Sequence, residues 1–327
     1  MENTWPKPTL IVSKCLGNTP CRYDGEATPC GLINKLKYFS NIIEVCPEEG
    51  IGLPTPRNAI RLISSSDDSV NLIDPKTLKD YTKNMCEFAN EMCIQYDTIS
   101  PNAFILKGRS PSCGIQGVKI YKGTEKGAAS KKGKGIFAME VMKNFKNIPI
   151  EEEGRLNNFD IREHFLIRIF VFAKFDEIKN TNKIKDLVEF HSKNKLLFMA
   201  YNQVGLKRLG NVVANHSHKD IKEILDEYNT NLILQLRKQP KYTSLINTYN
   251  HAFGYFSNNL NSEEKEFFLE TLDKFRLGKI PRSVITNLLK SYAIRFNNDY
   301  LLSQSILEPY PEELLDISDS GKGVVRD

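Results

Sequence analysis

Three cysteines, Cys15, Cys46 and Cys113, each lie at or shortly after the end of a short apolar run. Short apolar runs rich in β-branched residues predict buried strands. Ligands of an open parallel sheet bind beyond the carboxyl ends of its strands, so we expect these three thiols to converge. Three thiolates are one fewer than the four that close an iron–sulfur cluster or a structural zinc site. Such a set leaves one metal position open for a substrate.

The third cysteine lies in the turn GRSPSCG, residues 108–114. Its two glycines permit unusual backbone angles, and its proline stiffens the bend. The hydroxyls of Ser110 and Ser112 lie beside the thiol in sequence and are candidates for positioning a substrate or a water molecule. Taken alone, the segment is equally well explained as a strand-to-helix turn with a half-buried cysteine.

Charged residues accompany these cysteines. Glu48 lies two positions after Cys46, where a carboxyl group can act as an acid or a base; the alternative is a surface or helix-capping glutamate. Arg22 and Asp24 are close enough in sequence to form a local ion pair, and Arg22 is alternatively available for an anionic substrate group.

The other four cysteines are not expected to bind metal. Cys21 and Cys30 continue from Cys15 with the spacing C-x5-C-x8-C, which is not a known ligand pattern, and we predict that neither is a ligand. Cys86 and Cys93 fall on one face of an amphipathic helix predicted over residues 77–98, where small buried residues are the better interpretation.

The composition is that of a soluble globular protein, with 40% hydrophobic and 26% charged residues and a formal net charge of +5. This mild charge permits a nucleic-acid partner without requiring one. The seven cysteines are an odd number, which argues against a disulfide framework and for a reducing compartment. No run long enough to span a membrane and no signal peptide is visible, so a cytoplasmic location and no membrane partner are predicted.

The chain predicts two domains of different class. Strand patterns followed by helices up to about residue 150 predict an α/β domain, Rossmann-like with a mostly parallel sheet, at residues 1–153. Long helical periods then predict an all-α domain at residues 154–317, followed by a flexible tail at 318–327. Residues 119–135, rich in Gly and Lys, predict a flexible loop that either binds phosphate or is merely solvated.

Three motifs give the first half a family resemblance. They are V-S-x-C-L-G-x-x-x-C-R-Y-D-G from Val12, V-C-P-E followed by G-L-P-T-P-R up to Arg57, and L-K-x-R-S-P-S-C-G from Leu106. Together they resemble the TudS-type thiouracil desulfidases. The resemblance implies a [4Fe-4S] cluster held by three cysteines, with replacement of C=S by C=O and no net redox change. The residues expected to carry this activity are Cys15, Cys46 and Cys113 as cluster ligands, Glu48 and Ser110 as catalytic residues, and Arg22, Asp24, Lys107 and Ser112 as substrate-binding residues.

The second half resembles the helical YbgA-type domain through the block L-V-E-F-H-x-x-N-K-x-L-x-M-A, residues 187–200, although Asn194 stands where that pattern usually has His. Chains joining both domains resemble desulfidases of thiouridine, so tRNA or a thiolated nucleotide or nucleobase is the expected substrate. Basic and aromatic residues between Lys193 and Lys219 are candidates for gripping RNA. Two alternatives stay open: a cluster-dependent sulfur transferase or dehydratase, and a non-enzymatic iron–sulfur RNA-binding or sensor module.

Overall fold

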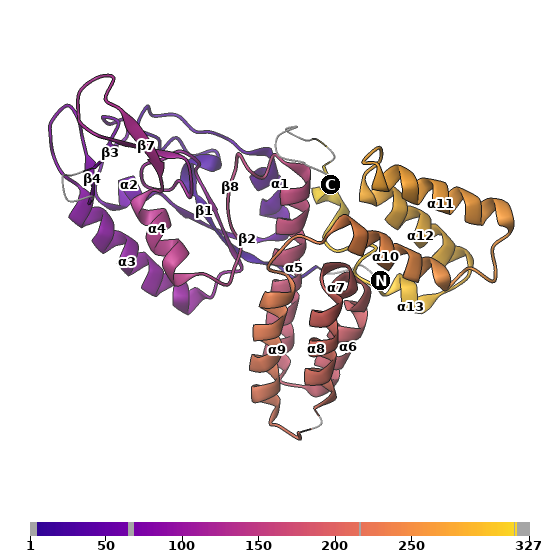
Figure 1. The fold of residues 1–327 in the computed structure, drawn as a ribbon. Coiled ribbons are helices and arrows are strands. Elements are labelled where there is room, and N and C mark those ends of the chain that lie inside the picture. The colour runs from indigo at the N-terminus through magenta and orange to yellow at the C-terminus, as the bar shows by residue number, and fades with distance from the viewer. Residues whose placement is uncertain (1–4, 65–68, 216, 317, 319–327) are drawn as a thin grey trace. The chain divides into compact units, whose positions relative to one another are not determined.

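The computed structural model describes residues 5–64, 69–215, 217–316 and 318 (Figure 1). The chain divides into two compact units between Phe165 and Leu166. The described part of the first unit is α/β, and that of the second contains only helices and their connections. The predicted fold class is therefore confirmed. Of the predicted C-terminal tail, only Ser318 lies within the described residues.

The first sheet places the three cysteine-bearing strands side by side. Its strands are all parallel, in the order β2-β1-β5-β8. Their bounds are β1 Thr9–Ser13, β2 Asn41–Val45, β5 Ala103–Leu106 and β8 Ile150–Glu152. Because β2 lies on one side of β1 and β5 on the other, the strand order reverses at β1. Such a switch point is where open α/β sheets bind ligands, at the carboxyl ends of the strands.

Helices and apolar side chains fix this sheet in place. Helix α1 (Gly31–Phe39) supplies the crossover that the parallel strands β1 and β2 require. Helices α3 (Thr82–Ile99) and α4 (Ile136–Asn144) lie side by side in Figure 1 and pack on each other. The buried core of the unit joins these two helices to both sheets, through residues such as Ile11, Leu62 and Phe137.

A second sheet was not predicted. Its order is β4-β3-β6-β7, with bounds β3 Arg61–Ser64, β4 Val70–Ile73, β6 Val118–Tyr121 and β7 Ser130–Gly133. Strands β3 and β6 are parallel, whereas β6 and β7 form an antiparallel hairpin. The prediction of a structureless loop at residues 119–135 was therefore wrong over both strands. Strand β7 has the sequence SKKG, which lacks the alternation of apolar residues that marks a strand.

Two predictions about helix α3 need correction. Helix α3 begins at Thr82 rather than at residue 77, because Leu78 adopts a left-handed backbone conformation and its side chain is exposed. The expected burial of both cysteines on this helix is right for Cys93 and wrong for Cys86, which is exposed. The stretch 149–154, predicted as a domain boundary, contains β8.

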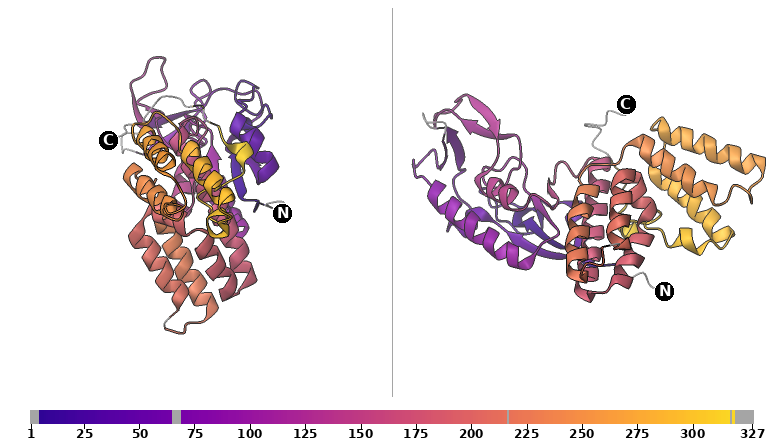
Figure 2. Two further views of the ribbon diagram at one scale, coloured as in Figure 1. Left: turned by 90° about the vertical axis from the view of Figure 1, so that its right-hand side faces the viewer. Right: turned by 60° about the horizontal axis from the view of Figure 1, so that its bottom comes forward.

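The second unit begins within α5 (Phe159–Thr181) and continues as helices only, as Figure 2 shows from two sides. These are α6 Ile184–Lys193, α7 Lys195–Tyr201, α8 Gln203–Ala214, α9 Ile221–Gln235, α10 Tyr242–Gly254, α11 Ser262–Arg276, α12 Arg282–Arg295 and α13 Asp299–Leu302. Helices α8 and α9 pack on each other, as do α11 and α12. Among the described residues, no helix has the length and apolar composition needed to cross a bilayer.

Candidate active site

The carboxyl ends of β1, β2 and β5 border a cavity of about 290 Å³. Cys15 reaches it from a short 3₁₀ turn (Lys14–Leu16) that directly follows β1. Cys46 reaches it from the residue between β2 and helix α2 (Pro47–Gly50). Cys113 reaches it from the turn after β5. The structure thus brings together the three thiols that the strand pattern predicted to converge.

The predicted polar residues divide between the cavity and its surroundings. Glu48, Ser110, Arg22 and Lys107 line the cavity, whereas Asp24 and Ser112 are not among its lining residues. Further residues line it that the sequence did not indicate as functional, among them Cys21, Tyr23, Arg57 and Arg109. The only sequence signal for Arg57 was its place in the G-L-P-T-P-R motif.

The turn that carries Cys113 is held by short-range hydrogen bonds. The hydroxyl oxygen of Ser110 accepts hydrogen bonds from the backbone N–H groups of Ser112 and Cys113, each at 3.2 Å. A side chain at Gly114 has no room, because its Cβ would lie 2.4 Å from Val118 Cγ2 and 2.9 Å from the Ser110 carbonyl oxygen. The turn also holds Arg109 at a φ of 62°, which is uncommon for a residue other than glycine. The motif therefore encodes one specific backbone path.

Glu48 is fixed from both sides of its carboxylate. Its Oε2 atom accepts a hydrogen bond from Arg57 Nε at 2.9 Å and lies 2.8 Å from Arg57 Nη2 in an ion pair, and its Oε1 atom accepts a hydrogen bond from the Ser112 hydroxyl at 3.0 Å. The side chains of Arg57 and Glu48 are only 4% and 13% exposed. Ser112, expected to touch substrate, is itself fully buried and orients Glu48. The network presents an oriented carboxylate at the edge of the cavity.

Two of the basic residues that line the cavity, Lys107 and Arg22, have acidic partners of their own. Lys107 forms an ion pair with Glu153, whose other oxygen accepts a hydrogen bond from the Gly108 N–H at 2.7 Å. Arg22 pairs with Asp24 at 3.0 Å, so the local ion pair considered from the sequence exists. Asp24 thus acts on the cavity through Arg22. These ion pairs restrict the motion of both side chains, and both side chains remain positively charged.

Burial dominates the electrostatics of the thiols. It raises the pKa of Cys15 to about 11; the nearby Cys46 adds to this rise and Lys107 opposes it. Burial likewise raises the pKa of Cys113 well above its ordinary value, with Cys15 and Cys46 contributing. The three thiols therefore lie close enough to influence one another electrostatically. Because thiolate rather than thiol binds metal, loading this site releases protons.

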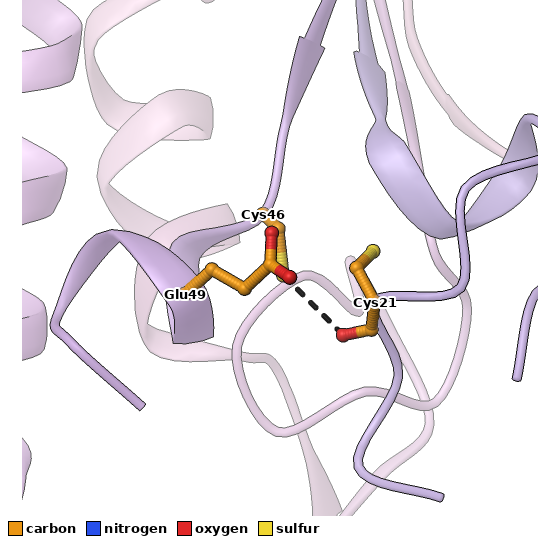
Figure 3. Close-up of side chains that lie close together, drawn as sticks. All are labelled: Cys21, Cys46 and Glu49. Carbon is orange, nitrogen blue, oxygen red and sulfur yellow. Dashed lines mark hydrogen bonds between the residues drawn. The ribbon is translucent and has the colours of Figure 1, made fainter. Parts of the chain in front are cut away.

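A fourth thiol lies within the same region (Figure 3). Ligand atoms of Cys21, Cys46 and Glu49 all lie within 4.8 Å of one another. The Cys46 thiol also donates to the backbone oxygen of Cys21 at 3.8 Å, the dashed line in Figure 3. Glu49 is already engaged by Lys14 at 2.8 Å and by the Thr55 hydroxyl at 3.2 Å. Cys21, which its spacing gave no reason to include, is thus a possible metal donor by position.

Two family profiles match the chain. One family, described as 2-thiouracil desulfurase, matches residues 10–153, and another, described as proteins of unknown function (DUF1722), matches residues 195–311. The two matches fall on the α/β and the helical parts of the chain respectively.

Individual proteins are similar to each part. The uncharacterized protein YbbK of Bacillus subtilis (strain 168) is 34% identical over 122 residues, which are 36% of this chain and 80% of that protein. The uncharacterized protein YbgA of Escherichia coli (strain K12) is 26% identical over 158 residues, which are 48% of this chain and 92% of that protein. A solved structure described as a [4Fe-4S]-dependent thiouracil desulfidase, TudS, is 28% identical and covers 46% of this chain and 93% of its own, with a TM-score of 0.38. Both resemblances drawn from the motifs are confirmed.

Proposed function

Since the chain belongs through residues 10–153 to the 2-thiouracil desulfurase family, we propose that its cysteine-lined cavity removes the sulfur of a thiouridine, as a nucleotide or in tRNA. The observation that carries the proposal is the convergence of Cys15, Cys46 and Cys113 on one cavity beside the oriented carboxylate of Glu48. In the reaction, water replaces sulfur at the thiocarbonyl carbon, which gives C=O and hydrogen sulfide. The oxidation level of the carbon does not change, so neither an oxidant nor a reductant is consumed.

The donor set suits the cofactor named for the solved relative. Thiolates are the ligands of [4Fe-4S] clusters, and three thiols from three different segments line the cavity. We propose that Cys15, Cys46 and Cys113 hold such a cluster. When bound, it supplies a metal position that three protein thiolates leave open to a soft donor such as the substrate's sulfur.

The protein's own side chains would handle water and protons. Glu48 borders the cavity with both carboxylate oxygens already oriented, so it is placed to accept a proton from the attacking water and to return it to the departing sulfur. Ser110 lines the cavity from the turn that carries Cys113 and is placed to orient the water or the edge of the base. Arg22 and Lys107 provide positive charge at the cavity wall for a substrate that becomes more anionic during attack.

Sulfide release after anaerobic cluster reconstitution tests the proposal. The full chain is incubated with 2-thiouracil, 4-thiouracil, 4-thiouridine monophosphate and thiolated tRNA, and sulfide and the desulfurated product are quantified. We expect stoichiometric sulfide and product from at least one of the thiouridine substrates. Absence of turnover on all four substrates by a protein with a full cluster would refute the proposal and favour a sensor or a binding module.

Cysteine variants test the ligand assignment in the same preparation. Substitution by Ser at Cys15, Cys46 or Cys113 should abolish both the visible absorbance of the cluster and turnover. Cys86→Ser is the matched control because this thiol is exposed on α3 and is not among the residues that line the cavity. If Cys21→Ser loses the cluster while Cys15→Ser retains it, the ligand set is the one drawn in Figure 3 and our assignment is wrong.

A further inference from the structure

A second set of metal-binding side chains overlaps the cysteine-lined cavity and differs from the three predicted cluster ligands. The thiols of Cys21 and Cys46 and a carboxylate oxygen of Glu49 all lie within 4.8 Å of one another. Within the described residues, no other group of His, Cys, Asp and Glu side chains brings three donor atoms this close together. Cys21 and Cys46 line the cavity, whereas Glu49 is not among its lining residues. We call this set the two-thiol site.

The donor atoms of the two-thiol site lie close to the spacing that a zinc ion requires. Zinc is bound tetrahedrally, with Zn–S bonds of about 2.3 Å and Zn–O bonds of about 2.0–2.2 Å, which places neighbouring donor atoms roughly 3.6–3.8 Å apart. Separations of up to 4.8 Å therefore need to shrink by only about 1 Å, which small side-chain rotations supply. The two sulfur donors favour zinc over magnesium and calcium, which prefer oxygen ligands.

The backbone that carries these donors is held in place. Cys46 directly precedes helix α2 and Glu49 lies three positions further on, so both side chains emerge on one side of the helix. Cys21 lies in the loop after β1, and its backbone oxygen accepts hydrogen bonds from Arg57 Nη2 at 3.0 Å and from the Cys46 thiol at 3.8 Å. Figure 3 shows these two segments facing each other. The site therefore needs little rearrangement to receive an ion.

The charges of the site balance when zinc is bound. Two thiolates and one carboxylate exceed the two positive charges of zinc by one negative charge. Lys14 supplies the balancing charge, because its Nζ atom lies 2.8 Å from Glu49 Oε2. The Thr55 hydroxyl donates to the other oxygen at 3.2 Å. A carboxylate offers about four lone-pair positions, so these two contacts leave Glu49 able to bind a metal ion.

The two-thiol site and the predicted cluster site share one residue. Cys46 belongs to both sets, so an ion on the two-thiol site and a cluster on the three cysteines exclude each other. Glu49 belongs to the two-thiol site alone, and in the sequence it lies between the two parts of the second motif without being part of either. Its substitution therefore changes one site and leaves the ligands of the other intact.

We propose that Cys21, Cys46 and Glu49 bind a Zn²⁺ ion in the chain without a cluster, with water from the cavity as the fourth ligand, and that this ion must leave before a cluster can use Cys46. Zinc binding itself is independent of the proposed function, whereas its competition with a cluster rests on that function. Because thiolates bind the ion, its uptake releases protons.

Metal titration of the full chain, reduced and before cluster reconstitution, tests the site. Isothermal titration measures zinc binding, and cadmium, which takes the same donors, reports the number of bound thiolates through its ultraviolet charge-transfer absorbance. We expect one zinc ion per chain and two thiolates per cadmium ion. Cys21→Ser and Glu49→Gln should each lower zinc affinity at least about tenfold, because loss of even an outer-shell partner of a metal costs about that much. Cys21→Ser should also remove about half of the cadmium–thiolate absorbance, whereas Glu49→Gln should retain it.

Matched variants separate this site from other thiols and carboxylates. Cys86 is an exposed thiol on α3, and Glu44 is an exposed carboxylate two residues before Cys46 that lies outside the donor group. Neither Cys86→Ser nor Glu44→Gln should change zinc affinity. Cys15→Ser and Cys113→Ser should also keep zinc binding, although they should lose the cluster. If Cys21→Ser does not fold, Glu49→Gln decides the matter, because the Glu49 side chain is 30% exposed.

Cluster reconstitution in the presence of zinc tests the competition. One equivalent of zinc, added before iron and sulfide, should reduce the visible cluster absorbance of the wild-type chain. Glu49→Gln should form its cluster with at least about tenfold more zinc present before the same reduction is seen, in line with its weaker zinc binding. Equal sensitivity of the two proteins to zinc would contradict competition through the two-thiol site.

Three thiolates per cadmium ion, or zinc affinity that falls in Cys15→Ser or Cys113→Ser but not in Glu49→Gln, would place the ion on the cluster cysteines and overturn the proposal. Absence of zinc binding by the reduced chain would overturn it as well. Neither result affects sulfide release by the cluster-loaded chain, so the proposed function would stand. Conversely, a chain that binds zinc as expected but releases no sulfide after cluster loading would retain the two-thiol site and refute the desulfidase.

Discussion

Replacing Glu48 by Gln should separate the structural from the chemical role of this carboxylate. The substitution keeps the shape of the side chain but leaves Arg57, only 4% exposed, without its counter-charge. Removing one partner of a buried ion pair costs about 3–5 kcal/mol. Because the Gln oxygen can still accept a hydrogen bond from Arg57, we expect a loss near the lower end, about 3 kcal/mol. For a unit of this size, that lowers the melting temperature by about 6–12 °C.

The assay is thermal denaturation of the full chain, followed by circular dichroism, with two comparisons. Asp24→Asn breaks an ion pair whose side chains are 27% and 28% exposed, and it should cost less than about 1 kcal/mol. The double variant Glu48→Gln/Arg57→Gln removes both buried charges, so its loss should be smaller than the sum of the two single losses. An unchanged melting temperature for Glu48→Gln, or additive losses in the double variant, would refute the buried-pair reasoning.

Activity measured well below the melting temperature tests the chemical role. If Glu48 moves protons, Glu48→Gln with an intact cluster should turn over about 10²-fold more slowly, the usual scale for general acid–base catalysis. Normal turnover by a folded but less stable variant would leave Glu48 with a structural role only.

Two other perturbations follow from the structure. Burial lowers the pKa of His191 to about 4, and the nearby Lys195 adds to this shift. As pH falls below 6.5, the unfolded chain therefore takes up a proton before the folded chain does, and the free energy of unfolding decreases. At pH 5 this decrease would be about 2 kcal/mol for a fully buried ring, and the partial exposure of His191 reduces it to about 1 kcal/mol. His191→Gln removes the titrating ring beside Tyr228, so its melting temperature should fall less than that of the wild type between pH 7 and pH 5, and equal falls would contradict this. Gly114→Ala should destabilise the first unit and abolish cluster loading, because the added Cβ would lie 2.4 Å from Val118 Cγ2. Gly31→Ala is the control and should do neither, because no atom lies within 4 Å of its added Cβ. Normal cluster loading by Gly114→Ala would show that the turn can shift to accommodate the methyl group.

The predictions from sequence succeeded where local pattern decides structure. Apolar runs placed β1, β2 and β5 correctly, and a parallel sheet then brings Cys15, Cys46 and Cys113 to one edge whatever the remaining details. Each of these inferences needed only the periodicity of a single segment.

The predictions were incomplete where contacts between distant segments decide structure. The hairpin of β6 and β7 lacks an apolar alternation because β7 is exposed along most of its length, so nothing local marks it as a strand. The second sheet depends on the register between β3 and β6, two strands separated by more than fifty residues. No spacing in the sequence indicates that Arg61 and Lys119 are neighbours.

Arg57 shows most clearly how the site depends on such contacts. Its guanidinium binds Glu48 through Nε and Nη2, and Nη2 also donates to the backbone oxygen of Cys21 at 3.0 Å. The same backbone oxygen accepts from the Cys46 thiol. The buried Arg57 side chain therefore connects the loop after β1, which carries Cys21, to the start of α2, which carries Glu48. It fixes the orientation of the Glu48 carboxylate and the position of Cys21 relative to Cys46. The same residue thus holds the Glu48 carboxylate and the segment that carries the fourth thiol. If Glu48 moves protons, as proposed, a substitution at Arg57 should disturb proton transfer and thiol placement together.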